Sequence, residues 1–183
     1  PKYLAQLRQA LFQEDFKKAE ELCRKMQGLY TESYLPLGNL VIRHHFTGAP
    51  TEYYRDLDIS QATALTRFKI GDTRYTREIL ASAPDQVIVI RLKADKKGQL
   101  NFDASTNSLI RFRNTAGGAN ELVMKGRAPS HVDPNYVNYN AEPVVYDPAD
   151  DCRGMRYELR IKARNKDGQV KTDSTGIHIT NAT

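Results

Sequence analysis

The amino-acid sequence predicts a mostly β protein, an antiparallel β-sandwich of the supersandwich type that follows two short amino-terminal helices. Apolar residues recur at helical spacing only as far as Met26, and from residue 34 onward they fall on alternate positions. Gly, Asn, Asp and Pro residues interrupt this alternation at regular intervals, which is typical of a sandwich or a barrel. We therefore expect a helical lead-in at residues 1–33 and a β-sandwich domain at residues 34–183.

The helical part divides into two helices at the polar run formed by residues 13–15. Asp15 is placed to cap the second helix, because its carboxylate can accept a backbone N–H of the first turn. Gly28 is placed to end that helix in the left-handed conformation. Cys23 lies on the apolar side of the pattern, so we expect it to be buried. The apolar positions are Leu4, Leu7, Leu11, Phe16, Ala19, Leu22, Cys23 and Met26.

Side-chain alternation predicts a series of short strands after residue 34. Gly71 and Asp72 predict a tight hairpin turn, and Pro84 and Asp85 predict the next turn. The unbroken apolar run at residues 87–90 predicts a central strand that is covered on both faces. The expected strands are 40–46, 62–69, 73–83, 86–94, 99–106, 121–125, 155–164 and 175–180.

Composition excludes several functional classes. The sequence has 27 basic and 22 acidic residues, and the basic ones are scattered, which favours a solvated surface over a nucleic-acid interface. No run approaches the roughly 20 apolar residues of a membrane-spanning helix, so we expect no membrane partner either.

Residues 126–151 do not follow the strand rhythm. This stretch contains four prolines, and loops of its length in a domain are usually functional or packed against another part of the protein. It also gathers tyrosines and asparagines, which suit the edge of a polar ligand such as a sugar and suit a domain interface equally well. The candidate residues for either role are His131, Asn135, Tyr136 and Tyr139.

The sequence predicts neither a metal site nor a cofactor. His44 and His45 are neighbours on a predicted strand and therefore point to opposite faces, so they do not share an ion. Asp147, Asp150 and Asp151 lack the regular spacing of a calcium loop. No phosphate-binding loop, nucleophile elbow or zinc helix is present, so no catalytic residue is predicted.

Several segments together resemble one family. They are YLPLGNLVI at residues 34–42, YYRDLDISQATALTRFKIGDTRYTREILASAPDQVIVIRLKA at 53–94, KGRAPSHVDPNY at 125–136 and GMRYELRIKA at 154–163. In this order they are similar to the amino-terminal domain of glycoside hydrolase family 95, the inverting α-L-fucosidases. The resemblance covers most of the chain, and the early segment FKKAEELCRKMQG at residues 16–28 is part of it.

The resemblance implies a supporting role in a larger enzyme. Family members place the β-domain ahead of a helical (α/α)6 barrel that holds the catalytic groups, so no catalytic residue is transferred to this sequence. It implies the catalytic domain of the same polypeptide as partner, a fucosylated glycan as the substrate of the parent, and a periplasmic or secreted location. Strand edges left uncovered in such a piece would favour self-association.

Two alternatives remain open at this point. The parent could act on an α-L-galactoside, because L-fucose is the 6-deoxy form of that sugar. The chain could also be a free-standing carbohydrate-binding module.

Overall fold

The computed structural model describes residues 2–27, 32–136, 141–148 and 153–183. The chain forms two compact units, one made of residues 1–34 with 132–143 and the other of residues 35–131 with 144–183. Each unit is considered by itself below. The division at residues 33 and 34 that the sequence suggests stays a prediction.

The smaller unit contains the two helices that the sequence predicts, α1 (Leu4–Phe12) and α2 (Phe16–Arg24). Asp15 caps α2 as expected, because the amide of Lys18 donates to Asp15 Oδ1 over 3.1 Å. The helices bury Ala10, Ala19 and Leu22 as a small shared cluster. Gly28 lies outside the described residues.

The expectation that Cys23 is buried is wrong, because its side chain is exposed. Ala19 and Leu22 are three positions apart on α2 and therefore share one face, which is the face that α1 covers. Cys23 follows Leu22 by one residue, about 100° further round the helix, and so lies on the flank. Two short helices cover only a narrow stripe of each other.

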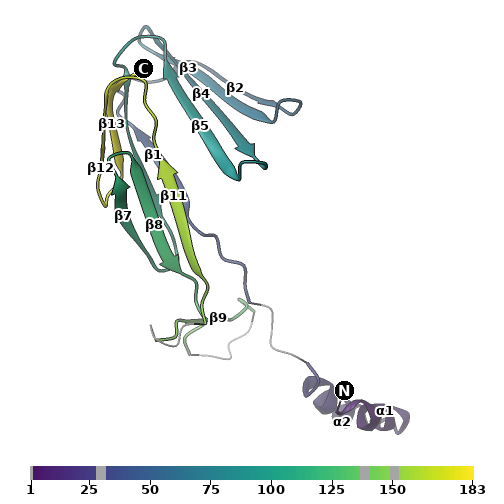
Figure 1. The fold of residues 1–183 in the computed structure, drawn as a ribbon. Helices are drawn as coiled ribbons and strands as arrows, with labels where there is room; N and C mark the ends of the chain where they lie inside the picture. The colour runs from purple at the N-terminus through teal and green to yellow at the C-terminus, as the bar shows by residue number, and fades with distance from the viewer. Residues whose placement is uncertain (1, 28–31, 137–140, 149–152) are drawn as a thin grey trace. The chain divides into compact units, whose positions relative to one another are not determined.

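The larger unit consists of antiparallel sheets, which confirms the mostly β fold class (Figure 1). Sheet A has the order β1 (Asn39–His44), β6 (Leu100–Asn107), β13 (Ile177–Ala182) and β12 (Gln169–Thr172). Sheet B has the order β2 (Thr51–Asp58), β3 (Thr63–Ile70), β4 (Thr73–Ser82) and β5 (Val87–Ala94). Sheet C has the order β11 (Arg156–Lys162), β8 (Glu121–Arg127) and β7 (Phe112–Gly118). The strands β9 (His131–Val132) and β10 (Val144–Val145) form a short pair.

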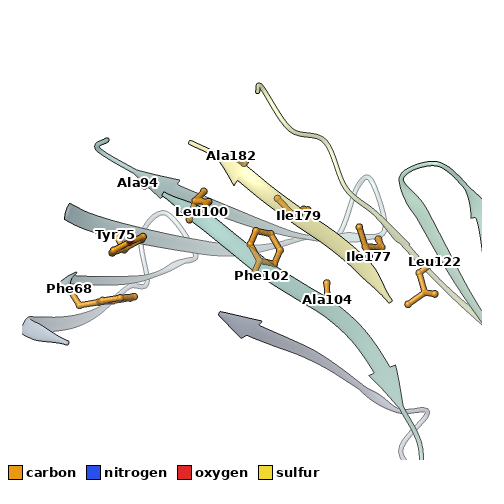
Figure 2. Close-up of a cluster of buried hydrophobic side chains, with 10 residues drawn as sticks. All are labelled: Phe68, Tyr75, Ala94, Leu100, Phe102, Ala104, Leu122, Ile177, Ile179 and Ala182. Atoms are coloured by element: carbon orange, nitrogen blue, oxygen red, sulfur yellow. The ribbon is translucent and has the colours of Figure 1, made fainter. Parts of the chain in front are cut away.

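One apolar core joins the three sheets (Figure 2). Sheet A supplies its centre from β6 and β13, sheet B adds Phe68 and Tyr75, and sheet C adds Leu122. The rings of Phe68 and Tyr75 stack with their centroids 5.4 Å apart. The buried residues of this core are Phe68, Tyr75, Ala94, Leu100, Phe102, Ala104, Leu122, Ile177, Ile179 and Ala182.

The prediction of a central strand at residues 86–94 is wrong in its position within the sheet. β5 is the edge strand of sheet B, and Val87, Ile88 and Val89 are 48%, 72% and 44% exposed. An apolar run indicates a strand that is suited to burial on both faces, but it does not specify what covers those faces. Among the described residues, no layer covers Val87, Ile88 and Val89 to the extent that the run predicted.

The sequence did not predict β2, β7 and β12, nor the two-residue strands β9 and β10. All eight residues of β2 are exposed, so they carry no alternation of burial that the sequence could display. β7 ends in two glycines, and β12 has only four residues with a lysine among them. β2, β7 and β12 each form backbone hydrogen bonds with a neighbouring strand, and this pairing makes them strands although their own side chains do not indicate it.

Candidate functional site

The residues predicted to touch substrate or another domain are neighbours in the sequence but are divided between the two compact units. His131 is half-buried in β9 and belongs to the larger unit. Asn135 and Tyr136 are exposed and belong to the smaller unit, with Tyr136 80% exposed. Tyr139 lies outside the described residues. All four stay candidates.

The carboxyl-terminal limb of the same loop is anchored on the larger unit. The Arg111 guanidinium lies over the Tyr146 ring, 4.0 Å from its centroid, and the Arg111 amide donates to Tyr146 Oη over 3.1 Å. Arg127 Nη2 donates to the carbonyl of Asp147. Beside Tyr146 lies an apolar cleft of about 660 Å³, lined by Leu35, Leu109, Ile110, Arg111, Phe112, Val144 and Tyr146. Its volume lies within the range of small-molecule sites.

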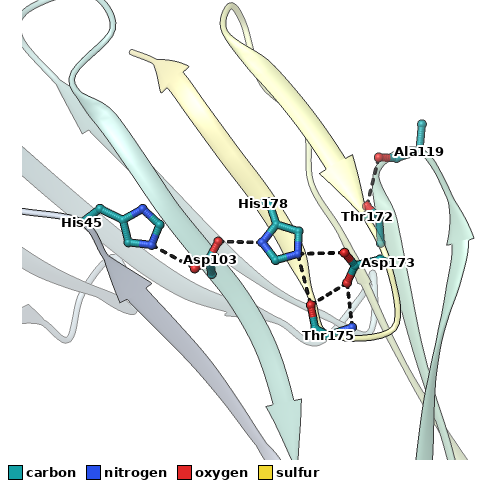
Figure 3. Close-up of polar contacts among 7 residues, drawn as sticks. All are labelled: His45, Asp103, Ala119, Thr172, Asp173, Thr175 and His178. Atoms are coloured by element: carbon teal, nitrogen blue, oxygen red, sulfur yellow. Dashed lines mark hydrogen bonds and ion pairs between the residues drawn. The ribbon is translucent and has the colours of Figure 1, made fainter.

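Sheet A carries a row of charged and polar side chains on the face opposite the core, and Figure 3 shows Asp103 and His178 of this row. Asp103 of β6 pairs in register with Arg43 of β1 on one side and with His178 of β13 on the other. His178 pairs in turn with Lys171 of β12. Directly paired residues of antiparallel strands share a face, so the four side chains form one row across the sheet.

Asp103 binds a histidine with each carboxylate oxygen. Its Oδ2 lies 2.9 Å from His45 Nε2, and its Oδ1 lies 2.7 Å from His178 Nδ1. The other nitrogen of His178 lies 3.3 Å from Asp173 Oδ2, in the turn between β12 and β13. Asp173 in turn accepts from the amide and the hydroxyl of Thr175, over 2.7 and 2.5 Å. The network therefore runs from His45 across β6 and β13 to the β12–β13 turn.

Thr175, His178 and Asp103 have the connectivity of a catalytic triad, since His178 Nε2 lies 3.3 Å from Thr175 Oγ1 and Nδ1 faces Asp103. The hydroxyl is engaged elsewhere, because it donates to Asp173 over a much shorter distance of 2.5 Å. A nucleophile must be activated by the base beside it. We therefore interpret the group as a structural network rather than a nucleophilic site.

The pKa directions follow from this geometry. The hydrogen bond to Asp103 raises the pKa of His178 above its usual value of 6.5, burial opposes this rise, and Asp173 adds to it. The hydrogen bond from His178 lowers the pKa of Asp103, with a further contribution from His45. Hydrogen bonds from Thr175 lower the pKa of Asp173 still more strongly. Each charged form is thus stabilised by its partners.

His44 faces the opposite side of the sheet from His45, as its place in the strand predicts. Its ring stacks on Phe46 with centroids 4.7 Å apart, and Arg77 Nη2 donates to His44 Nε2 over 3.0 Å. Burial, followed by the positive charge of Arg77, lowers the pKa of His44 to about 4. His44 is therefore neutral at pH 7. Its Nδ1 and the Arg77 Nε are buried and make no hydrogen bond within the described residues, which costs stability.

The half of sheet B nearest the β4–β5 turn exposes an apolar surface on the core-facing side. Strand register places Leu57, Ile79 and Ile90 in one row across the sheet. Ile88 lies two residues before Ile90 on β5 and therefore on the same face. Leu57 is 65% exposed and Ile88 is 72% exposed, although both share a face with buried Phe68 and Tyr75. We call Leu57, Ile79, Ile88 and Ile90 the distal patch.

No group of three or more His, Cys, Asp or Glu side chains in the described residues is arranged to hold a metal ion. Asp150 and Asp151 lie outside the described residues, and Asp147 is paired with Arg153 Nε over 3.1 Å. None of the described helices has the length and apolar character needed to cross a membrane.

Comparison with known proteins identifies the class of protein to which this chain belongs. Residues 1–183 match the model of the family described as glycosyl hydrolase family 65, N-terminal domain, and the chain belongs to this family. It is an N-terminal domain of a glycoside hydrolase. The family number differs from the 95 implied by the sequence segments, but both point to the same kind of domain.

The chain is also similar to α-L-fucosidase 2 of Arabidopsis thaliana, with 28% identity over 174 residues. This match covers 92% of the chain and 20% of the relative, so the chain spans about one fifth of that protein's length. The resemblance to the amino-terminal domain of the fucosidase family is thereby confirmed.

Proposed function

We propose that this chain is a non-catalytic β-sandwich domain of a larger α-L-fucosidase-like inverting glycoside hydrolase, in which it supports the catalytic (α/α)6 barrel. The distal patch is the observation that carries this proposal. Its residues continue the core-facing surface of sheet B beyond the point where sheet A covers it. Exposed contiguous apolar surface of this kind marks an interaction site more often than a solvated face.

The patch has enough apolar area to stabilise an interface. Leu57 and Ile88 are more than half exposed, and fully burying a side chain of this size contributes about 1.5–3 kcal/mol. The other side of the same strands adds Leu80, Val87 and Val89, which are 38%, 48% and 44% exposed. Both faces of this end of sheet B are therefore suited to a covering layer, and the partner that we assign to them is the catalytic domain of the same polypeptide.

The loop at residues 126–151 supplies the second part of the proposal. An inverting glycosidase needs a general acid, a base-activated water and room for that water between the two groups. In our proposal the barrel provides these groups, and the loop borders one side of the cleft through His131, Asn135, Tyr136 and Tyr139. The exposure of Tyr136 leaves its ring available for such a contact.

The substrate of the parent in this proposal is a fucosylated glycan, acted on in a periplasmic or secreted location. An α-L-galactoside is the alternative substrate, because it differs from an α-L-fucoside by the hydroxyl at C6. A free-standing carbohydrate-binding module is the alternative role. The apolar cleft beside Tyr146 favours that role, since sugars bind to apolar clefts that present an aromatic ring and a few polar groups.

The first experiment compares the full-length parent with this chain on aryl α-L-fucoside and aryl α-L-galactoside. We expect the parent to hydrolyse the fucoside and the chain to hydrolyse neither. Turnover by the chain alone would overturn the non-catalytic role, and turnover of the galactoside in preference would replace the substrate. Saturable binding of a glycan by the chain without a catalytic partner would favour the module.

The second experiment tests the distal patch in the full-length parent. Ile88→Asp places a charge on the patch, and Met155→Asp is the matched control because Met155 is 77% exposed and lies outside the patch. We expect Ile88→Asp to lower the thermal midpoint of the parent by several degrees and Met155→Asp to leave it within about one degree. Equal midpoints for the two variants would contradict the assignment of the patch.

A further inference from the structure

The two ring nitrogens of His178 both face carboxylates. Nδ1 lies 2.7 Å from Asp103 Oδ1, and Nε2 lies 3.3 Å from Asp173 Oδ2. A neutral imidazole has one N–H and one lone pair, whereas the protonated ring donates from both nitrogens. Only the protonated ring satisfies both contacts at once, because a neutral ring would turn a lone pair towards one of the two carboxylates.

We propose that His45, Asp103, His178 and Asp173 form a pH-sensitive clasp, in which protonation of His178 fastens the β12–β13 turn to β6 and its deprotonation releases the turn. Asp103 is fixed on β6, the central partner of β13 in sheet A, and Asp173 is in the turn (Figure 3). The imidazolium is the link between them. Among the described residues, its loss leaves the Asp173 carboxylate bonded to Thr175 of the same turn.

Charged groups on every neighbouring strand face this link. Lys171 of β12 lies opposite His178, and Arg43 of β1 lies opposite Asp103. His45 binds the second oxygen of Asp103. The hydrogen bond to Asp103 is the largest cause of the raised pKa of His178, burial opposes it, and Asp173 adds to it.

The directions of the pKa shifts determine the pH range in which the clasp contributes fully to stability. The raised pKa of His178 stabilises the folded chain fully below about pH 6.5, and this contribution is lost as the pH rises through the folded value. The lowered pKa values of Asp103 and Asp173 stabilise it above about pH 4, and this contribution is lost as the pH falls further. The contribution of the clasp to stability is therefore complete between about pH 4 and 6.5.

Release at higher pH has a defined local consequence. The hydroxyl of Thr175 donates to Asp173 while His178 is charged, and it lies 3.3 Å from His178 Nε2, which becomes an acceptor when it loses its proton. The hydroxyl can then turn from Asp173 to His178. Thr172, the last residue of β12 and the neighbour of Asp173, donates from its hydroxyl to the carbonyl of Ala119 over 2.9 Å, so the clasp lies beside the connection between β7 and β8.

Two measurements on the 183-residue chain test the clasp. The histidine ring resonances, followed by NMR, should give His178 a midpoint above 6.5, and Asp173→Asn should bring it towards 6.5. Hydrogen exchange of the Thr175 amide, corrected for the intrinsic pH dependence, should show protection that falls by roughly threefold to tenfold between pH 6 and 9. His178→Gln should remove this fall.

Lys171→Gln is the matched control, because it changes a charge in the same row without removing a hydrogen bond of the clasp. We expect it to keep the pH dependence of Thr175 protection and to move its midpoint upward, if at all. Protection that does not change with pH in the unmodified chain would overturn the proposal, as would an unchanged fall in His178→Gln. If His178→Gln does not fold, Asp173→Asn provides the same comparison from an exposed turn position.

Discussion

At the scale of single residues, close approach explains why glycine stands in segments that carry the family resemblance. A Cβ on Gly38 would lie 2.7 Å from the carbonyl oxygen of Asn107, and one on Gly126 would lie 2.5 Å from that of Arg111. The Gly126 position would also meet the Tyr157 ring at 2.2 Å. Backbone atoms on a neighbouring strand or connection cannot move aside cheaply, so these positions exclude any side chain.

We expect Gly126→Ala to destabilise the chain by about 2–3 kcal/mol, because the added methyl group displaces both Tyr157 and the backbone at Arg111. Urea denaturation monitored by circular dichroism measures the change. Gly118→Ala is the control, since nothing lies within 4 Å of its Cβ position, and it should stay within about 0.5 kcal/mol of the unmodified chain. Equal stability of the two variants would refute the packing explanation.

At the scale of the elements, the two faces of sheet A shift the pKa values of His44 and His178 in opposite directions. His44 points into the apolar interior beside Arg77, and His45 points to the polar face beside Asp103. His178 shares that polar face. Burial lowers the pKa of His44 on the inner side, and the hydrogen bond to Asp103 raises the pKa of His178 on the outer side.

These opposite shifts predict a maximum of global stability near pH 6.5. The pKa of His44 is lowered to about 4, so the unfolded chain binds a proton that the folded chain does not, and stability falls as the pH drops below 6.5. The raised pKa of His178 makes stability fall above that value. The loss on the acid side to pH 4 should be on the order of 2 kcal/mol, after allowance for the partial exposure of the ring.

Urea midpoints measured between pH 4 and 9 test this expectation. His44→Gln should flatten the acid side of the profile and leave the alkaline side in place, whereas His178→Gln should do the reverse. A profile that declines steadily through pH 6.5 in one direction would be incompatible with two opposing histidines.

At the scale of the whole molecule, the free edge of β5 governs how the chain behaves in isolation. β5 ends sheet B, its backbone groups on the outer side have no strand partner among the described residues, and three of its first residues are exposed and apolar. An apolar edge strand is a template for pairing with another chain. Arg91 and Lys93 lie only towards its far end.

We expect the isolated chain to self-associate as its concentration rises, and Val89→Lys to reduce this association by placing a charge on the edge. Sedimentation velocity over a concentration series measures the effect. Leu109→Lys is the control, because Leu109 is 92% exposed and lies away from sheet B. A chain that stays monomeric throughout, or a control that acts as strongly as Val89→Lys, would show that the edge is not responsible.

The local features of the fold were predictable where a residue's role depends on its immediate neighbours. Asp15 caps α2, and Gly71 with a φ of +56° makes the turn between β3 and β4. The exposed strand β2, the flank position of Cys23 and the edge position of β5 were not predictable, because each depends on what lies beside it in space. The candidate loop residues were predicted from the composition of residues 126–151. The Asp103 network was not predictable, because positions 45, 103, 173 and 178 lie far apart in the sequence and meet only in the folded sheet.

The sequence by itself determined the fold class, the helical beginning and the family, since periodicity, turn residues and ordered segments are properties of the linear chain. Only the tertiary structure decided which strands are covered, in which direction the pKa values of His44 and His178 are shifted and which apolar residues face solvent. The physical reason is that burial and charge pairing depend on the distances between strands that lie far apart in the chain, and strand alternation specifies two faces without specifying what each of them meets.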